Sequence, residues 1–293
     1  MAQRKTKVLQ NIPVELKSII KTPITIPPNT SILDARDILL RHRIGRLVIE
    51  FGKKPVGIIT EKDIARSVSF YSKKPLGKIL VGDVMSKNLV TTNVDSTIKE
   101  CAKLMKKNGI SSVVMVNSRG KLVGVVTKTD LVGTFLVQST ASLEISKVMT
   151  KKVITVSPED SIFEVESLLF NNNIRRIVVI KNKIPIGIIT YRDFIPAKPF
   201  DMKKGLSDPS EIEEMSQIPQ INELNVNRLS YLITFTASDI MTKNPVVVYP
   251  DDVVYTAAIL MIRHDISGIP VIKNKKLVGI ITKSDIVNVL AER

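Results

Sequence analysis

The sequence predicts a mixed α/β (α+β) fold built from four β-α-β-β-α repeats. The first observation is a seven-residue phrase of glycine, two apolar residues, threonine, two variable residues and aspartate, which occurs at residues 57–63, 124–130, 187–193 and 279–285. The second is an amphipathic segment of helical period before each phrase. The third is a pair of β-rich runs joined by a short polar turn, which is typical of neighbouring strands. A unit of roughly 50–60 residues buries too little surface to be stable alone, so we expect two pairs of repeats.

Each repeat is expected to begin with a short extended run, at residues 23–26, 89–92, 153–156 and 245–248. Polar clusters that can cap a helix start follow at residues 29–31, 95–97, 157–160 and 250–252. The helix of the second repeat shows the expected spacing of three and four in Ile98, Cys101, Ala102, Leu104 and Met105. The first strand of each hairpin is expected at 47–49, 113–116, 177–180 and 269–272. After the phrase, a second helix is expected to open at Ile64, Leu131, Phe194 and Ile286.

A methionine and a hydroxyl residue precede three of the extended runs, as Met85-Ser86, Met149-Thr150 and Met241-Thr242, whereas the first repeat has Ile20-Lys21. With the central helix and the phrase, these residues resemble the CBS domain, from about residue 16 to the C-terminus. The resemblance implies that the repeats pair into two Bateman modules. It also implies that the modules meet as a flat, pseudo-symmetric disc, as in archaeal relatives of the gamma subunit of AMP-activated protein kinase.

The expected boundaries are a basic tail at 1–15, repeats at 16–70, 80–138, 144–197 and 233–293, and an insertion or linker at 198–232. The insertion carries an acidic stretch at Glu211, Glu213 and Glu214, and a short helix is expected at 209–217. This segment could be a docking element or only a long connection.

Positive charge is concentrated in one half of the chain. Residues 1–140 hold 24 lysines and arginines against 10 acidic residues, residues 141–293 hold 19 against 18, and the net charge is +15. The asymmetry indicates an anionic partner for the first half, or else a solvated lysine-rich surface of the kind found in heat-adapted, for example archaeal, proteins. No run of 18 uncharged apolar residues predicts a membrane helix, the N-terminus lacks a signal-peptide core, and Cys101 is the single cysteine. We therefore expect a cytoplasmic protein without membrane contact.

The threonine and aspartate of the phrase allow two interpretations. The pair can simply cap the helix that follows, with the acid at the positive end of the helix dipole. In nucleotide-binding CBS domains the matching aspartate accepts hydrogen bonds from ribose, and the matching threonine contacts ribose or phosphate. The resemblance thus implies ribose-binding roles for Asp63, Asp130, Asp193 and Asp285, together with Thr60, Thr127, Thr190 and Thr282. It also implies an adenine pocket near Ile24, Val90, Ile154 and Val246.

A phosphate-binding site would require positive charge. The four repeats differ in charge just before the first strand of the hairpin, where such a site is expected. Arg46 and Arg176 match the phosphate-binding arginine of the kinase gamma subunit, and Arg175 stands where that family has a histidine. The other two repeats have serines instead, at Ser111, Ser112 and Ser267. We therefore expect fewer than four strong sites, at least one in each module; ion pairs are the alternative role of the arginines. His42 and His264 are expected only to suit the C-terminal end of a helix.

The motifs of common enzyme classes are absent from the sequence, and one cysteine with two histidines cannot build a Cys/His zinc site. We expect no catalytic residue, no metal site and no required cofactor. The favoured interpretation is a regulatory sensor of AMP, ADP or ATP, with which Mg²⁺ could enter, that signals to an unknown protein or ribonucleoprotein partner; an S-adenosyl ligand fits the arginines less well. The alternatives are an RNA-, ribosome- or DNA-binding protein that docks through residues 1–140, and a scaffold with vestigial sites. A homodimer is compatible with each.

Overall fold

Four similar units follow one another along the chain in the computed structural model, which describes residues 14–70, 76–138, 142–195 and 235–292. The first repeat consists of the 3-10 turn η1 (Leu16–Ile19), β1 (Thr25–Ile26), α1 (Ile32–Arg41), β2 (Arg46–Phe51), β3 (Lys54–Thr60) and α2 (Glu61–Phe70). The second consists of η2 (Leu76–Lys78), α3 (Val81–Val84), β4 (Thr91–Asn93), α4 (Ile98–Lys107), β5 (Ser112–Val116), β6 (Leu122–Thr127) and α5 (Lys128–Gln138).

The second half of the chain repeats this order. The third repeat consists of η3 (Ile145–Lys147), β7 (Thr155–Val156), α6 (Ile162–Asn171), β8 (Arg176–Lys181), β9 (Ile184–Thr190) and the 3-10 turn η4 (Tyr191–Phe194). The fourth consists of α9 (Ala237–Ile240), β10 (Thr242–Lys243), α10 (Val254–Arg263), β11 (Gly268–Lys273), β12 (Lys276–Thr282) and α11 (Lys283–Glu292). The predicted insertion at 198–232, with its expected helix, lies outside the described residues, as does nearly all of the basic tail.

The central helix begins with a side-chain cap in three repeats and without one in the fourth. Ser31, Thr97 and Ser161 cap α1, α4 and α6 with their side chains. At the start of α10, Asp252 bonds instead to the backbone of Tyr249, and Val253 gives no side-chain cap.

The expectation of a second helix at Phe194 is wrong for the described part of the third repeat. Only the 3-10 turn η4 forms there, and Ile195 leaves helical geometry with ψ 70°. Pro196 follows directly, and a residue before proline disfavours the α region. The other three repeats do form a helix after the phrase.

Each hairpin pairs the residue that opens its first strand with the threonine of the phrase. Arg46 lies opposite Thr60, and Arg176 lies opposite Thr190, in antiparallel register. The short first strands β1, β4 and β7 join the same sheets in parallel. The hairpin geometry therefore brings each arginine beside the phrase of its own repeat.

The repeats exchange chain segments in two reciprocal pairs. The N-terminal segment of the second repeat bridges to the first repeat at Ser86 and Ile58, and the N-terminal segment of the first repeat bridges to the second through Lys21 and Val125. In the same way Thr150 bridges to Ile280 of the fourth repeat, and β10 of the fourth repeat pairs with β9 of the third. The chain thus forms the pairs 1–2 and 3–4.

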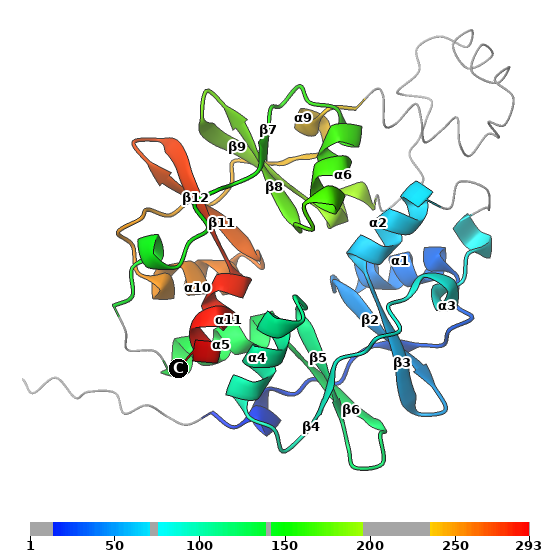
Figure 1. The fold of residues 1–293 in the computed structure, drawn as a ribbon. Helices are drawn as coiled ribbons and strands as arrows, with labels where there is room; N and C mark the ends of the chain where they lie inside the picture. Colours follow the sequence, from blue (N-terminus) through cyan, green and yellow to red (C-terminus); the bar gives the residue numbers. More distant parts are fainter. Residues whose placement is uncertain (1–13, 71–75, 139–141, 196–234, 293) are drawn as a thin grey trace, which may run out of the picture.

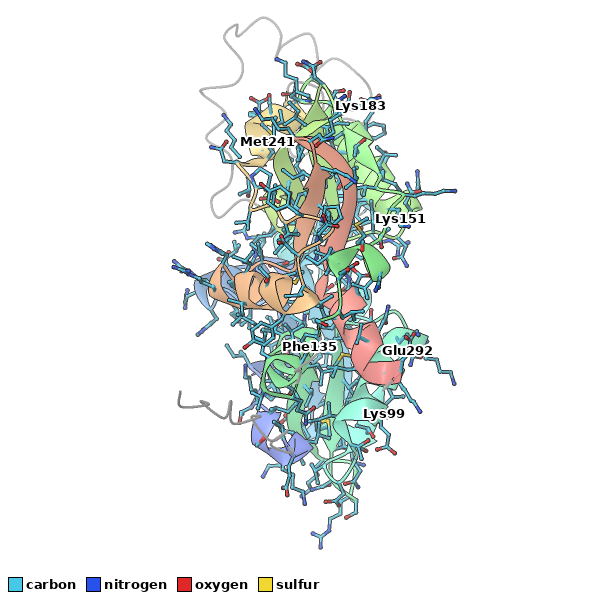
Figure 2. All side chains as sticks on the ribbon, turned by 90° about the vertical axis from the view of Figure 1, so that its left-hand side faces the viewer. Lys99, Phe135, Lys151, Lys183, Met241 and Glu292 are labelled. Atoms are coloured by element: carbon cyan, nitrogen blue, oxygen red, sulfur yellow. The ribbon has the colours of Figure 1, made fainter. Side chains whose placement is uncertain are left out.

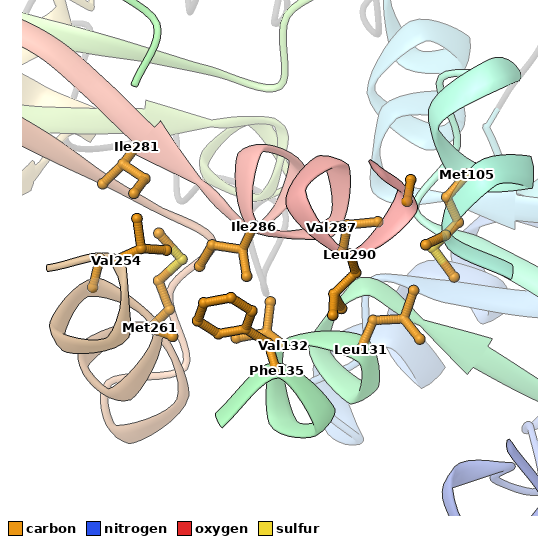
Figure 3. Packing of buried hydrophobic residues seen from close by; sticks show 14 of the residues in the cluster. Met105, Leu131, Val132, Phe135, Val254, Met261, Ile281, Ile286, Val287 and Leu290 are labelled. Atoms are coloured by element: carbon orange, nitrogen blue, oxygen red, sulfur yellow. The ribbon is translucent and has the colours of Figure 1, made fainter. Parts of the chain in front are cut away.

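Helices join the two pairs. Repeats 2 and 4 share the largest buried core, in which α4, α5, α10 and α11 pack together with Met105, Phe135, Met261 and Leu290 among the residues in contact (Figure 3). Repeats 1 and 3 meet where Ala65 of α2 joins the core of repeat 3 and Ile195 joins that of repeat 1. In Figure 1 the repeats therefore follow a ring in the order 1, 2, 4, 3. The molecule is broad in that view and narrow in Figure 2, where Phe135 lies inside and Lys99 near one end.

Among the described helices, none has both the length and the apolar character that a membrane crossing would need.

Candidate functional site

One carboxylate oxygen of each phrase aspartate caps the segment that follows it. The backbone N–H of Thr60 donates to Asp63 Oδ2 at 2.8 Å, and the Thr60 hydroxyl donates to the same atom at 2.6 Å. The other three phrases repeat both bonds at 2.6–2.9 Å, in the pairs Thr127 with Asp130, Thr190 with Asp193 and Thr282 with Asp285. The capping interpretation is therefore realised in every repeat.

The second carboxylate oxygen distinguishes the repeats. Among the described residues, no other residue donates a hydrogen bond to Oδ1 of Asp63, Asp193 or Asp285. Burial raises the pKa of these three carboxyls, against the opposing effect of the threonine hydrogen bonds. In the second repeat, by contrast, Lys21 Nζ lies 2.6 Å from Asp130 Oδ1, and the Asp130 side chain is only 3% exposed. Three aspartates thus keep an acceptor oxygen that suits a sugar hydroxyl.

The segment exchange decides which apolar residue lies near which aspartate. Each bridge between paired repeats falls two residues before a phrase threonine, as Ser86 with Ile58 shows for Thr60. The runs that follow these bridges carry the predicted adenine residues, all partly buried: Val90 accompanies Asp63, Ile24 accompanies Asp130, Val246 accompanies Asp193 and Ile154 accompanies Asp285. Each candidate site is therefore built by two repeats. A single sequence carries only one signal of this crossing, the glycine of the phrase, whose missing side chain makes room for methionine in three of the four cases.

The predicted arginines reach out of their own repeats. Arg46 Nη1 donates to the Ser111 carbonyl at 3.1 Å, and Arg175 Nη2 donates to the Gly109 carbonyl at 3.3 Å. Burial, and then repulsion by Arg175, lowers the pKa of Arg46 to about 10. The Nε atom of Arg46 is buried without a hydrogen-bond partner in the described part of the chain.

Arg176 is anchored to the fourth repeat. Its guanidinium donates to the carbonyl of Ser267 and, at 2.6 Å, to the Ser267 hydroxyl. Burial, and then repulsion by Arg175, lowers its pKa to about 10 as well. Gly268 leaves the space that this side chain fills, because a Cβ there would meet the guanidinium. Neither Arg46 nor Arg176 makes an ion pair with a described carboxylate, so the alternative role predicted for them is not observed within those residues.

Two lysines that the sequence analysis did not single out complete this region. Lys128 Nζ donates to the Ser284 hydroxyl at 2.7 Å, and Lys283 Nζ donates reciprocally to the Thr129 hydroxyl at 3.0 Å. Burial, followed by repulsion from Arg175 and other arginines, lowers the pKa of Lys128 to about 8. Both lysines directly follow the threonine of the phrase in repeats 2 and 4, and this shared position was the available signal.

All four repeats contribute to what we call the central cation cluster, which consists of Arg46, Lys62, Lys128, Arg175, Arg176 and Lys283. Each member donates a hydrogen bond to a repeat other than its own; Lys62, for example, reaches Asn173 at 2.5 Å. Burial lowers the pKa values of these side chains, and the members lie close enough that repulsion among them lowers several of these values further. No member forms an ion pair with a carboxylate of the described chain. Such a group is suited to a multivalent anion.

The neighbouring residues fit this picture. Glu61, which directly precedes Lys62, is held by Arg192 at 2.6 Å across the interface of repeats 1 and 3. Tyr191 packs against Phe170 in the same interface, and its hydroxyl is buried without a partner in the described chain.

His42 and His264 are exposed C-caps of α1 and α10, which matches the role expected of them. Within the described ranges, no group of three histidine, cysteine or acidic side chains could hold a metal ion.

Four tandem repeats of this fold define the class of protein. The family model described as CBS domain matches residues 16–69, 81–136, 145–199 and 237–292, so the chain belongs to the CBS domain family.

Two relatives that match more than nine tenths of this chain come from one archaeon. Protein MJ1404 of Methanocaldococcus jannaschii is 26% identical over 98% of this chain, which spans 63% of the length of MJ1404. Protein MJ1225 of the same organism is 24% identical over 92% of this chain and 96% of its own length. The crystal structure of MJ1225, which has been proposed as an archaeal homologue of γ-AMPK, superposes with a TM-score of 0.78 at 23% identity over 95% of this chain and 100% of the other. A Pyrococcus horikoshii protein superposes with a TM-score of 0.62 at 21% identity over 94% of this chain and 100% of the other. These structures share the fold.

Proposed function

We propose that this protein is a non-catalytic sensor of adenine nucleotides. The observation that carries the proposal is the proximity of unpaired acceptor oxygens to unpaired cations. Burial lowers the pKa of Arg176 and Lys128, and Asp285 partly offsets this lowering; Asp63 does the same for Lys62 and Arg175, so carboxylate and cation lie within electrostatic reach of each other. An anion with vicinal hydroxyls, such as a ribose phosphate, matches both groups at once.

In the proposed mode, the ribose hydroxyls donate to Asp63, Asp193 and Asp285. The adenine base lies against the partly buried run of the paired repeat, near Val90, Val246 and Ile154. The phosphates point toward the central cation cluster, where arginines offer fixed pairs of donors. AMP, ADP and ATP would then differ in how many cations they engage, and Mg²⁺ would enter only as the partner of ATP.

Signalling follows from the position of the cluster between repeats. Its members belong to both pairs of repeats and repel one another, so a bound phosphate lowers the cost of holding the pairs together. A ligand shifts such an equilibrium only by its different affinity for the two arrangements. We propose that the nucleotides differ in this respect and that a protein or ribonucleoprotein partner responds to the change.

Isothermal titration of AMP, ADP, ATP and adenosine tests the proposal. We expect AMP to bind more tightly than adenosine. Substituting Arg176→Met should weaken AMP binding by at least about tenfold, because a hydrogen bond to a charged group contributes about 1.5–3 kcal/mol, while adenosine binding should hardly change. Arg119→Met is the matched control, since Arg119 lies exposed in the β5–β6 turn. Absence of binding by every adenylate would overturn the sensor.

A second function is favoured by the outer face of α4. Lys99, Lys103, Lys106 and Lys107 are all exposed on this helix, beside a groove of about 710 Å³ that Thr92, Ser96 and Leu104 help to line. A cationic helix face of this kind suits the phosphates of RNA, with a steep dependence on salt. Elution of the protein free of RNA from a sizing column at low salt would rule this function out.

A further inference from the structure

We infer that the cleft of the second repeat is closed by the chain itself, with the Lys21 ammonium group in the place that a ribose hydroxyl would take on Asp130. The inference rests on the proposed function and identifies which of the four clefts takes no nucleotide.

Both oxygens of Asp130 are already engaged. Its Oδ2 accepts from the backbone N–H of Thr127 at 2.8 Å and from the Thr127 hydroxyl at 2.6 Å, as in every repeat. Its Oδ1, the atom that stays available in the other three aspartates, lies 2.6 Å from Lys21 Nζ. The side chain of Asp130 is 3% exposed, so a ligand would have to displace the lysine to reach it.

The position of Lys21 in the segment exchange explains why only this cleft is closed. Lys21 makes the backbone bridge to Val125 that Ser86, Thr150 and Thr242 make in the other three cases. Those residues are short and uncharged, whereas a lysine at the same place carries its ammonium to the neighbouring carboxylate. The first repeat carries Ile20-Lys21 where the other three repeats carry a methionine and a hydroxyl residue. This difference is visible in the sequence, and it acts on the cleft of the paired second repeat.

The remainder of this cleft is equipped to bind. Burial lowers the pKa of Arg46 and Lys283, and Asp130 partly offsets this lowering, which places two members of the central cation cluster within electrostatic reach of its carboxylate. Ile24 lies on the run that faces it and is partly buried, like its three counterparts. A free carboxylate oxygen is therefore the missing part, and withdrawing the ammonium is costly because it removes the ion-pair partner in direct contact with a buried carboxylate. The apparent affinity of the cleft equals its intrinsic affinity multiplied by the fraction of time that Lys21 is withdrawn.

The number of AMP molecules bound per chain, measured by equilibrium dialysis, tests the inference. Lys21→Thr installs the residue that repeats 3 and 4 carry at this place, and we expect it to take up one more AMP per chain than the wild type. Lys21→Arg keeps a cation and should leave the number unchanged. Lys17→Thr is the matched control, since Lys17 lies in the same segment and pairs only with the exposed Asp95.

Two further measurements identify the added site. Adding Asp130→Asn to Lys21→Thr should remove the extra AMP, and 2′,3′-dideoxy-AMP should fail to occupy it. If the wild type binds AMP and Lys21→Thr binds no more, the inference fails while the proposed function stands. If the wild type already loses one AMP upon Asp130→Asn, the inference likewise fails. If neither protein binds AMP, the proposed function fails and the inference with it.

Discussion

At the scale of single residues, the phrase aspartates combine two roles that appear as alternatives in the sequence. One oxygen of Asp63 caps the following helix through Thr60, and the other remains without a donor from any other described residue. A carboxylate offers enough lone pairs for both tasks, so a structural cap and a ligand contact do not compete. The structural role holds the acceptor in place before a ligand arrives.

The lowered pKa of Lys128 predicts how nucleotide binding depends on pH. Its value of about 8 in the folded protein means that Lys128 loses its charge as the pH rises from 7 to 9, while a phosphate is already fully ionised. AMP affinity should therefore fall over this range. The Lys128→Met variant should bind AMP more weakly at pH 7 and lack this part of the pH dependence, as titration calorimetry at several pH values can show. Equal slopes in the two proteins would contradict the prediction.

The lowered pKa of Lys128 affects stability in the direction opposite to its effect on AMP affinity. Because the pKa of Lys128 is lowered from 10.5 to about 8 on folding, the unfolded chain binds more protons between these values. The contribution of Lys128 to the free energy of unfolding therefore becomes more favourable as the pH rises through this window. Lys128 thus weakens the folded state at neutral pH, as expected of a residue retained for binding.

At the scale of elements, the exchanged segments fit because glycine faces methionine. A Cβ at Gly187 would collide with the sulfur of Met241, and Gly57 and Gly279 stand in the same relation to Met85 and Met149. The side chains pack across the two repeats of a pair, so a change on either side alters their association.

Gly187→Ala should therefore destabilise the protein by about 1–3 kcal/mol, the usual cost of an extra group in a packed contact. In the double variant with Met241→Ala the cost should be less than the sum of the single costs, because the collision is relieved. Urea denaturation gives both values. Gly133→Ala is the control: Gly133 lies in α5, a Cβ there would meet nothing within 4 Å, and alanine suits a helix better than glycine. Additive costs would contradict the proposed contact.

Much of the element level could be predicted, and the errors have local causes. Periodicity, caps and turns depend on neighbours in the chain, so the order of strands and helices follows from the sequence. The helix expected at Phe194 was wrong because Pro196 overrides the apolar pattern there. At the site, Arg176 lies within electrostatic reach of Asp285, and Arg46 within reach of Asp130. The positions of Lys128 and Lys283 and the ion pair of Lys21 depend on contacts between different repeats, which the sequence does not reveal.

At the scale of the whole molecule, repulsion inside the central cation cluster works against the core that repeats 2 and 4 share. AMP should relieve this repulsion and raise the midpoint of thermal unfolding, with a gain of about 2.7 kcal/mol for each occupied site at a ligand concentration of one hundred times Kd. The triple variant Asp63→Asn, Asp193→Asn and Asp285→Asn should lose the shift in scanning calorimetry while Asp130→Asn keeps it. An equal shift in the triple variant would place AMP elsewhere.

The sequence by itself determined the four repeats, their elements and the residue types of the candidate site, because each of these depends on short-range periodicity and on a phrase repeated in register. Only the tertiary structure decided how the repeats exchange segments, which apolar run accompanies which aspartate, and that Lys21 lies on Asp130. These are contacts between residues that lie tens to more than a hundred positions apart, and their energies depend on burial and charge that no single segment carries. The four phrases, equivalent in the chain, differ in the fold: among the described residues, Asp63, Asp193 and Asp285 keep a carboxylate oxygen without a donor from another residue, and Asp130 does not.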